Sequence, residues 1–174
     1  MHIHPKITPI YQTSVFKFDD LNELELYFGE PGSRYLYSRN GNPNSDELAG
    51  AVNALEQGAG AVATGSGMAA IFAALMCYCQ AGDHVLCAQD IYGGSSSLLD
   101  QELSRLGISV GYVPFDDLCQ DLTPYLQPRT RLLLCETISN PLLRVVELGA
   151  AAAACHAHGL KLVVDNTFAT PILT

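Results

Sequence analysis

An aspartate stands at the end of an apolar run in this sequence. Asp165 follows residues 161–164, and a carboxylate there is costly to bury unless it meets a positive group or a full set of hydrogen bonds. A protonated pyridine nitrogen is one such partner, and the pairing would make the ring a better electron sink. A metal ion and a structural arginine are alternative partners, and all three stay open at this point.

A glycine-rich stretch, residues 65–68, lies between another apolar run and a predicted helix. Small residues let the backbone approach a ligand closely, and a helix start offers unpaired N–H groups with a partial positive charge. The stretch would suit a phosphate, with Ser66, Gly67 and Met68 as candidate binding residues. A tight turn in which glycine serves geometry alone is the alternative.

Two further polar loops follow apolar runs. Tyr92 stands beside two glycines, and its ring could lie on a planar cofactor. Asn140 could hydrogen-bond a ligand oxygen. The alternatives are an aromatic ring packed under a loop and an asparagine that shapes a turn before proline.

Upstream, Tyr37 and Arg39 are separated by one serine. Arginine makes bidentate hydrogen bonds to phosphate, and a tyrosine hydroxyl can add another. This pair is therefore a second candidate phosphate contact. An exposed loop with an ordinary surface arginine is the alternative.

Short apolar runs alternate with helical patterns from residue 44 onward. This alternation predicts an α/β fold with a mainly parallel sheet and helices on both faces. Ligands of such sheets bind outside the carboxyl ends of the strands, where the loops described above belong. The predicted strands are 61–64, 84–88, 108–113, 131–135 and 161–165. The predicted helices are 21–28, a helix from the N-cap Asn44 to a stop at Gly58, 68–79, 95–106, a short piece at 123–126, and 147–158.

Residues 1–43 are polar, aromatic and rich in turn formers, without a sustained period. They are predicted to form an N-terminal arm that lies on another subunit or domain, because such arms are seldom stable alone. Residues 44–174 are predicted to form the α/β domain.

Composition restricts the partners. With 48% hydrophobic and 16% charged residues the chain is ordinary for a globular protein, and its net charge of −9 argues against nucleic acid and membrane partners. No apolar run is long enough to span a membrane, and the N-terminus has no secretory stretch. The six cysteines lack a C-x-x-C pair and predict reduced thiols in a cytoplasmic protein. No metal site is expected, since the pairs Cys77 and Cys79 or His156 and His158 diverge on a helix.

The order and spacing of five blocks resemble the Cys/Met metabolism pyridoxal-phosphate (PLP) enzymes, or trans-sulfuration family, which includes cystathionine γ-synthase, cystathionine lyases, methionine γ-lyase and homoserine sulfhydrylases. The blocks are 37–43, 65–70, 90–95, 136–147 and 163–171. The resemblance implies an aspartate-aminotransferase-like, fold type I large domain, here truncated, and the cofactor pyridoxal 5′-phosphate. It implies elimination or replacement at Cβ or Cγ of a small amino-acid substrate: cysteine, cystathionine, methionine or activated homoserine.

The resemblance also implies roles for residues around the phosphate. Tyr37 and Arg39 correspond to the pair that reaches across a subunit interface to the phosphate of a neighbour's cofactor. Gly67 and Met68, following Ser66, correspond to backbone donors to the phosphate of the chain's own cofactor. A homo-oligomer, a dimer of dimers in the complete family, is therefore expected.

Around the ring, the resemblance makes Tyr92 the catalytic residue, which stacks on the pyridine and assists proton transfer. Asn140 corresponds to the ligand of the ring hydroxyl, Asp165 to the partner of the pyridine nitrogen, and Thr167 to a neighbouring ring contact. Gly65 and Ser95 stand where the family more usually has serine or alanine, and threonine.

The family holds its cofactor on a lysine a few tens of residues beyond the aspartate. Nine residues follow Asp165 here, and none of Lys6, Lys17 and Lys161 is placed to serve. We therefore expect a fragment or truncated product that is inactive alone. The alternative is a non-catalytic binding or split-enzyme subunit that pairs with a lysine-bearing partner, such as a complementary C-terminal half. An unrelated nucleotide-binding domain is disfavoured, because residues 65–70 lack G-x-G-x-x-G and no P-loop lysine is present.

Overall fold

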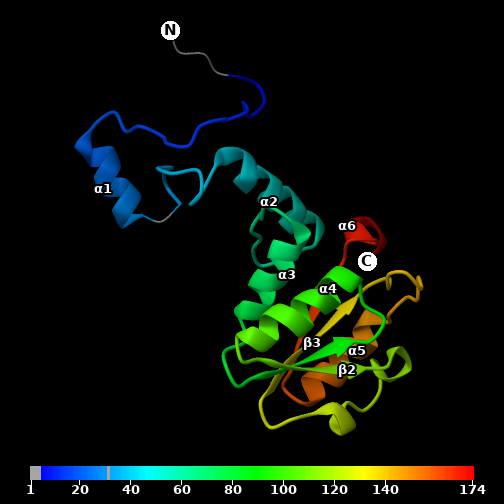
Figure 1. Cartoon of the computed structure of the whole chain (residues 1–174). Helices are drawn as coiled ribbons and strands as arrows, with labels where there is room; N and C mark the ends of the chain where they lie inside the picture. Colours follow the sequence, from blue (N-terminus) through cyan, green and yellow to red (C-terminus); the bar gives the residue numbers. More distant parts are fainter. Residues whose placement is uncertain (1–4, 31) are drawn as a thin grey trace. The chain divides into compact units, whose positions relative to one another are not determined.

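The computed structural model describes residues 5–30 and 32–174, and it divides into two compact units, Met1–Ala63 and Thr64–Thr174. The first unit contains helices α1 (Leu21–Gly29) and α2 (Pro43–Leu55), shown in Figure 1. The predicted helix at 21–28 is confirmed. It begins where the Asp20 side chain accepts a hydrogen bond from the Glu23 N–H at 3.0 Å, an N-cap that satisfies one of the free donors of the first turn.

The predicted N-cap of α2 is wrong by two residues. Asn42, and not Asn44, is the cap, and its Oδ1 accepts a hydrogen bond from the Asn44 N–H at 2.9 Å. Pro43 explains the shift, because proline has its φ preset for the first helical position and needs no hydrogen bond there. The Asn44 side chain instead ties down the preceding chain: it accepts from the Tyr11 N–H and donates to the Pro9 carbonyl, both at 2.8 Å.

The C-terminal end of α2 also differs from the prediction. Helix α2 stops at Leu55, and the left-handed residue beyond it is Gln57, with φ at 50°. Gly58, the predicted stop, donates its N–H back to the Asn53 carbonyl at 2.9 Å. The predicted strand at 61–64 is wrong, because these residues pair with no strand in the described part of the chain and Val62 is 87% exposed. An apolar run becomes a strand only beside a partner.

The second unit is built on a four-stranded, fully parallel sheet in the order β2-β1-β3-β4. Its strands are β1 (His84–Ala88), β2 (Ser109–Val113), β3 (Thr130–Glu136) and β4 (Lys161–Asp165). The predicted bounds 84–88 and 161–165 are confirmed, and the other two strands lie within one residue of prediction at each end. Because the strands are parallel, Glu136 and Asp165 end neighbouring strands side by side in register.

Helices connect these strands and cover both faces, which confirms the predicted α/β architecture (Figure 1). The predicted helix at 95–106 is realised as α4 (Gly93–Ser97) followed by a π-helical segment, η1 (Leu98–Leu103). In η1, Asp100 accepts a hydrogen bond from the Tyr112 hydroxyl of β2 at 2.7 Å. A helical period does not distinguish an α-turn from the wider π-turn. The remaining elements are α3 (Gly67–Met76), η2 (Phe115–Asp117), η3 (Thr123–Tyr125), α5 (Leu148–Ala157) and α6 (Thr170–Leu173).

The core has two layers, because alternate side chains of each strand point to opposite faces. On one face, Leu86 and Leu133 pack with Cys155 of α5. On the other, Leu134 packs with Leu75 of α3 and Leu99 of η1. The central strands β1 and β3 are buried on both faces, whereas β2 and β4 are partly exposed. Across residues 5–30 and 32–174, no helix has the length and apolar character needed to cross a membrane.

Candidate functional site

A cavity of about 290 Å³ lies at the carboxyl ends of the strands in the Thr64–Thr174 unit. It brings together seven of the nine cofactor-binding residues predicted from the sequence. These are Ser66, Gly67, Met68, Tyr92, Asn140, Asp165 and Thr167. Four further residues line it that were not predicted as site residues: Ile71, Glu136, Ile138 and Phe168.

The N-terminus of α3 supplies the donor side of the cavity. Ser66 is the N-cap, and its hydroxyl oxygen accepts a hydrogen bond from the Ala69 N–H at 3.1 Å. The Ala70 N–H bonds the Ser66 carbonyl, also at 3.1 Å. Within the described residues this leaves the N–H groups of Gly67 and Met68 without an acceptor, as helix geometry requires of a first turn. A Cβ added to Gly67 would meet nothing within 4 Å, so a ligand can approach these donors closely.

Asp165 supplies an acidic side. Its Oδ1 accepts hydrogen bonds from the Thr167 N–H at 3.0 Å and the Thr167 hydroxyl at 2.5 Å. These bonds fix the carboxylate without neutralising it. In the part of the chain that the structure describes, no lysine, arginine or histidine forms an ion pair with Asp165, and no group of acidic, histidine or cysteine side chains is arranged to hold a metal. The carboxylate therefore remains available to a cationic ligand.

Asp83 shows how the same unit treats a structural carboxylate. It lies just before β1, is 1% exposed, and accepts hydrogen bonds from the Gln80 N–H at 3.0 Å and from Arg129 Nε at 2.8 Å. Arg131 adds an ion pair at 3.1 Å. Burial alone would raise the pKa of Asp83, but these hydrogen bonds and the guanidinium groups outweigh it and lower the pKa. Among the described residues, no arginine forms an ion pair with Asp165, so its environment differs from that of Asp83.

Glu136 lies between the polar loops of the cavity and is 7% exposed. Its Oε1 accepts a hydrogen bond from the Tyr92 N–H at 3.2 Å, and its Oε2 accepts one from the Asn140 N–H at 2.9 Å. Burial raises the pKa of Glu136, the two N–H donors lower it in part, and the neighbouring charge of Asp165 raises it further. Glu136 ends an apolar strand as Asp165 does, and that shared signal could have identified it from the sequence.

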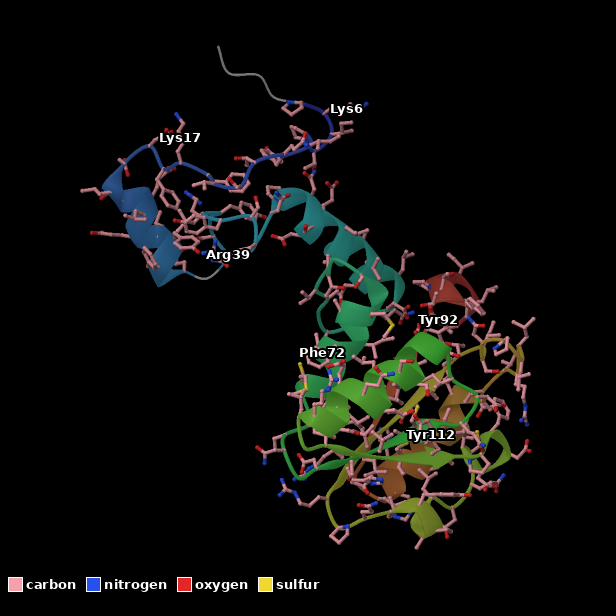
Figure 2. The ribbon with its side chains drawn as sticks, in the orientation of Figure 1. Lys6, Lys17, Arg39, Phe72, Tyr92 and Tyr112 are labelled. Carbon is pink, nitrogen blue, oxygen red and sulfur yellow. The ribbon has the colours of Figure 1, made fainter. Side chains whose placement is uncertain are left out.

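Tyr92 lies at the start of α4 (Figure 2), with 47% of its surface exposed. Its ring lies so close to Gly94 that a Cβ added there would be 2.4 Å from Tyr92 Cε1. The adjacent Gly93 has nothing within 4 Å of the same position. The observed position of the Tyr92 ring therefore requires a residue without a Cβ at position 94 but not at position 93.

The substitution Gly94→Ala is expected to displace the Tyr92 ring, because the new methyl group would overlap it. The sheet should stay intact, because the ring is the nearest group to the new methyl and can rotate away. NMR contacts between the ring protons and the backbone of residue 94 measure the displacement. Gly93→Ala is the matched control and should leave the Tyr92 ring signals unchanged. Equal ring signals in Gly94→Ala and the unmodified chain would contradict the prediction.

Tyr37 and Arg39, the other two predicted residues, lie in the Met1–Ala63 unit. The Arg39 guanidinium carbon is 4.6 Å from the centre of the Tyr37 ring, and Tyr37 forms an antiparallel bridge with Val15. The two side chains are thus neighbours on one loop. Their predicted contact with a neighbouring subunit's phosphate stays a prediction.

In the described residues, this parallel α/β unit brings helix N–H groups without acceptors and a carboxylate without an ion-pair partner into one cavity, an arrangement that suits a phosphate and a cationic group. The model of the family described as Cys/Met metabolism PLP-dependent enzyme matches residues 2–174, and the chain belongs to this family.

Individual relatives agree with this assignment. The chain is 40% identical over 166 residues to an L-methionine gamma-lyase of Fusobacterium nucleatum subsp. polymorphum. The matched region covers 95% of this chain and 42% of that protein. It is 41% identical over 165 residues to a cystathionine beta-lyase of Lactococcus lactis subsp. cremoris, covering 95% and 41%. The chain therefore spans about two fifths of the length of the curated relatives it matches.

Solved structures confirm the fold. A Campylobacter jejuni structure assigned as an O-acetylhomoserine (thiol)-lyase superposes with a TM-score of 0.86 at 32% identity, covering 94% of this chain and 40% of the other. That structure contains a pyridoxyl-lysine-phosphate group. A cystathionine gamma-lyase from Lactobacillus plantarum, complexed with L-serine, has a TM-score of 0.81 at 34% identity, with the same coverage. The predicted fold type is thereby confirmed.

Proposed function

We propose that the Thr64–Thr174 unit binds pyridoxal 5′-phosphate and forms the phosphate and ring side of a trans-sulfuration active site. The observation that carries the proposal is the pairing, in one cavity, of the free Gly67 and Met68 N–H groups with the unpaired Asp165 carboxylate. The first two suit a phosphate, and the third suits a protonated pyridine nitrogen. The donor set thus matches both ends of this cofactor.

The remaining side chains fit the rest of the ring. The Asn140 amide is available for the ring hydroxyl, and the half-exposed Tyr92 ring can stack on the pyridine. Thr167 donates to Asp165 and so orients the carboxylate. When bound, the cofactor supplies an electron sink for negative charge at Cα of an amino acid. Asp165 would hold the proton on the pyridine nitrogen, and the Tyr92 hydroxyl would carry protons.

The activity proposed for the whole protein is elimination or replacement at Cβ or Cγ of cysteine, cystathionine, methionine or activated homoserine. The family assignment and the named lyases support it. We further propose a cytoplasmic location, which the free and mostly buried cysteines support.

The lysine that holds the cofactor is proposed to come from outside the Thr64–Thr174 unit. Lys161 begins β4 and Asp165 ends it, so at about 3.3 Å per residue the two lie about 13 Å apart along the strand.

The proposed partners are further copies of the chain in a homo-oligomer, in which Tyr37 and Arg39 reach a neighbour's phosphate, or a lysine-bearing complementary half. In the second case the chain is a non-catalytic or split-enzyme subunit, and in either case we propose that it is inactive alone.

Pyridoxamine 5′-phosphate tests the proposal, because it has the ring and the phosphate but needs no lysine. Titrated into the full chain and followed by its own fluorescence, it should bind saturably, and pyridoxamine without the phosphate should bind at least tenfold more weakly, or about 1.4 kcal/mol. Absence of binding, or equal binding of the two compounds, would overturn the proposed function. Lyase activity of the chain alone toward cystathionine or methionine would overturn its dependence on an added lysine.

A further inference from the structure

We propose that Glu136 is a positioning residue. Its two hydrogen bonds form a tie between the loop after β1, which contains Tyr92, and the loop after β3, which contains Asn140. This tie sets the distance between the two side chains that face the cofactor ring. The positioning of Tyr92 and Asn140 toward a cofactor ring rests on the proposed function. The two hydrogen bonds are present in the chain without any ligand.

The geometry supports this role. Glu136 ends β3, which lies between β1 and β4 in the sheet. Each of its carboxylate oxygens accepts one backbone N–H, from Tyr92 at 3.2 Å and from Asn140 at 2.9 Å. Tyr92 lies 44 residues away in the sequence. One buried carboxylate therefore fixes the loops that follow two adjacent strands.

A carboxylate is the side chain that these two contacts require. Both contacts are made by donors, so both of the terminal atoms of the side chain must be acceptors. In Glu136→Gln one terminal atom becomes an NH₂ group, which would face an N–H donor, and one tie would be lost. In Glu136→Asp the side chain is shorter by one methylene, and it could not reach both amides.

The charge of Glu136 has no cationic partner among the described residues. The groups that face it are the Asp165 carboxylate on β4 and the thiols of Cys87 on β1 and Cys135 on β3. The guanidinium of Arg144, in the loop that follows β3, pairs with Asp90 and Asp116. A cationic ring paired with Asp165 would offset the repulsion between the two carboxylates.

Amide NMR of the full chain tests the tie without a ligand. The Tyr92 and Asn140 amide protons should titrate together as Glu136 gains its proton, with one midpoint above the ordinary glutamate pKa of about 4.3. Glu136→Gln should abolish this common titration. Glu147→Gln is the matched control, since Glu147 also accepts a backbone N–H, from Ala150 at 2.6 Å, but does not line the cavity. Independent titrations of the two amides in the unmodified chain would overturn the tie.

Pyridoxamine 5′-phosphate binding tests its purpose. Glu136→Gln and Glu136→Asp should each bind the probe about tenfold more weakly and reduce the shift of the Tyr92 ring signals on binding, whereas Glu147→Gln should match the unmodified chain. Unchanged affinity and ring shifts in both Glu136 variants would overturn the positioning role. Failure of the unmodified chain to bind the probe would overturn the proposed function alone, because the amide titration reads Glu136 without ligand. If Glu136→Gln does not fold, Glu136→Asp and the unmodified chain decide.

Discussion

Asp165→Asn is expected to weaken pyridoxamine 5′-phosphate binding at least tenfold, or about 1.4 kcal/mol, and to remove its dependence on ring protonation. The asparagine keeps an oxygen for the Thr167 N–H and hydroxyl, so the loop should hold its shape. What is lost is the negative charge, which no side chain in the described residues neutralises. In the unmodified chain, affinity should fall as the pH rises past the value at which the free ring nitrogen loses its proton.

The pH profile separates this charge effect from a general weakening of the site. In Asp165→Asn the affinity should be nearly flat across the same range, because a neutral amide gains little from a protonated ring. Asp121→Asn is a close control: Asp121 makes the same pair of contacts with Thr123, at 2.9 and 2.6 Å, but does not line the cavity. A pH profile of Asp165→Asn parallel to that of the unmodified chain would contradict the role of Asp165 as the partner of the protonated ring nitrogen.

The strands of the sheet could be predicted from the sequence because burial on both faces demands continuous apolar runs. Residues 84–88, buried throughout, illustrate this. Residues 161–165 form the edge strand β4 and are only partly buried, but they keep the same apolar run, and the ends of both runs marked loops that line the cavity. The run at 61–64 has the same character but no partner strand in the described residues, and composition alone does not reveal whether a neighbour exists. Strand pairing is a tertiary property, so this error could not be avoided from local pattern.

The N-cap of α2 was predicted wrongly and the role of Glu136 was missed, for different reasons. Asn44 is a good N-cap by type, but Pro43 takes the first helical position and the capping role passes to Asn42. Glu136 depends on an amide 44 residues away, and no spacing rule connects the two. A carboxylate ending an apolar run was nevertheless recognised at Asp165. The same physical argument applied to Glu136 would have identified it as a buried group in need of partners.

Leu133→Ala is expected to destabilise the Thr64–Thr174 unit by about 2–5 kcal/mol, the cost of lost burial plus the cavity left behind. Leu133 is fully buried on β3, in the layer that contains Leu86 and Cys155. Against a total stability of about 5–15 kcal/mol for a typical domain, this loss is large. Amide hydrogen exchange of β1 and β3 under native conditions measures it, because the slowest amides of a unit report its global opening.

Leu142→Ala is the control, since Leu142 is 60% exposed on the loop after β3 and its truncation should cost less than about 0.5 kcal/mol. Equal exchange rates in the two variants would contradict the packing argument. The comparison with Glu136→Gln is informative as well, because both residues lie on β3. Leu133→Ala should accelerate exchange throughout the sheet, whereas Glu136→Gln should act mainly on the amides of Tyr92 and Asn140. Separate responses would show that Leu133, in the interior of β3, stabilises the whole unit, whereas Glu136, at the end of the same strand, sets the geometry of the cavity.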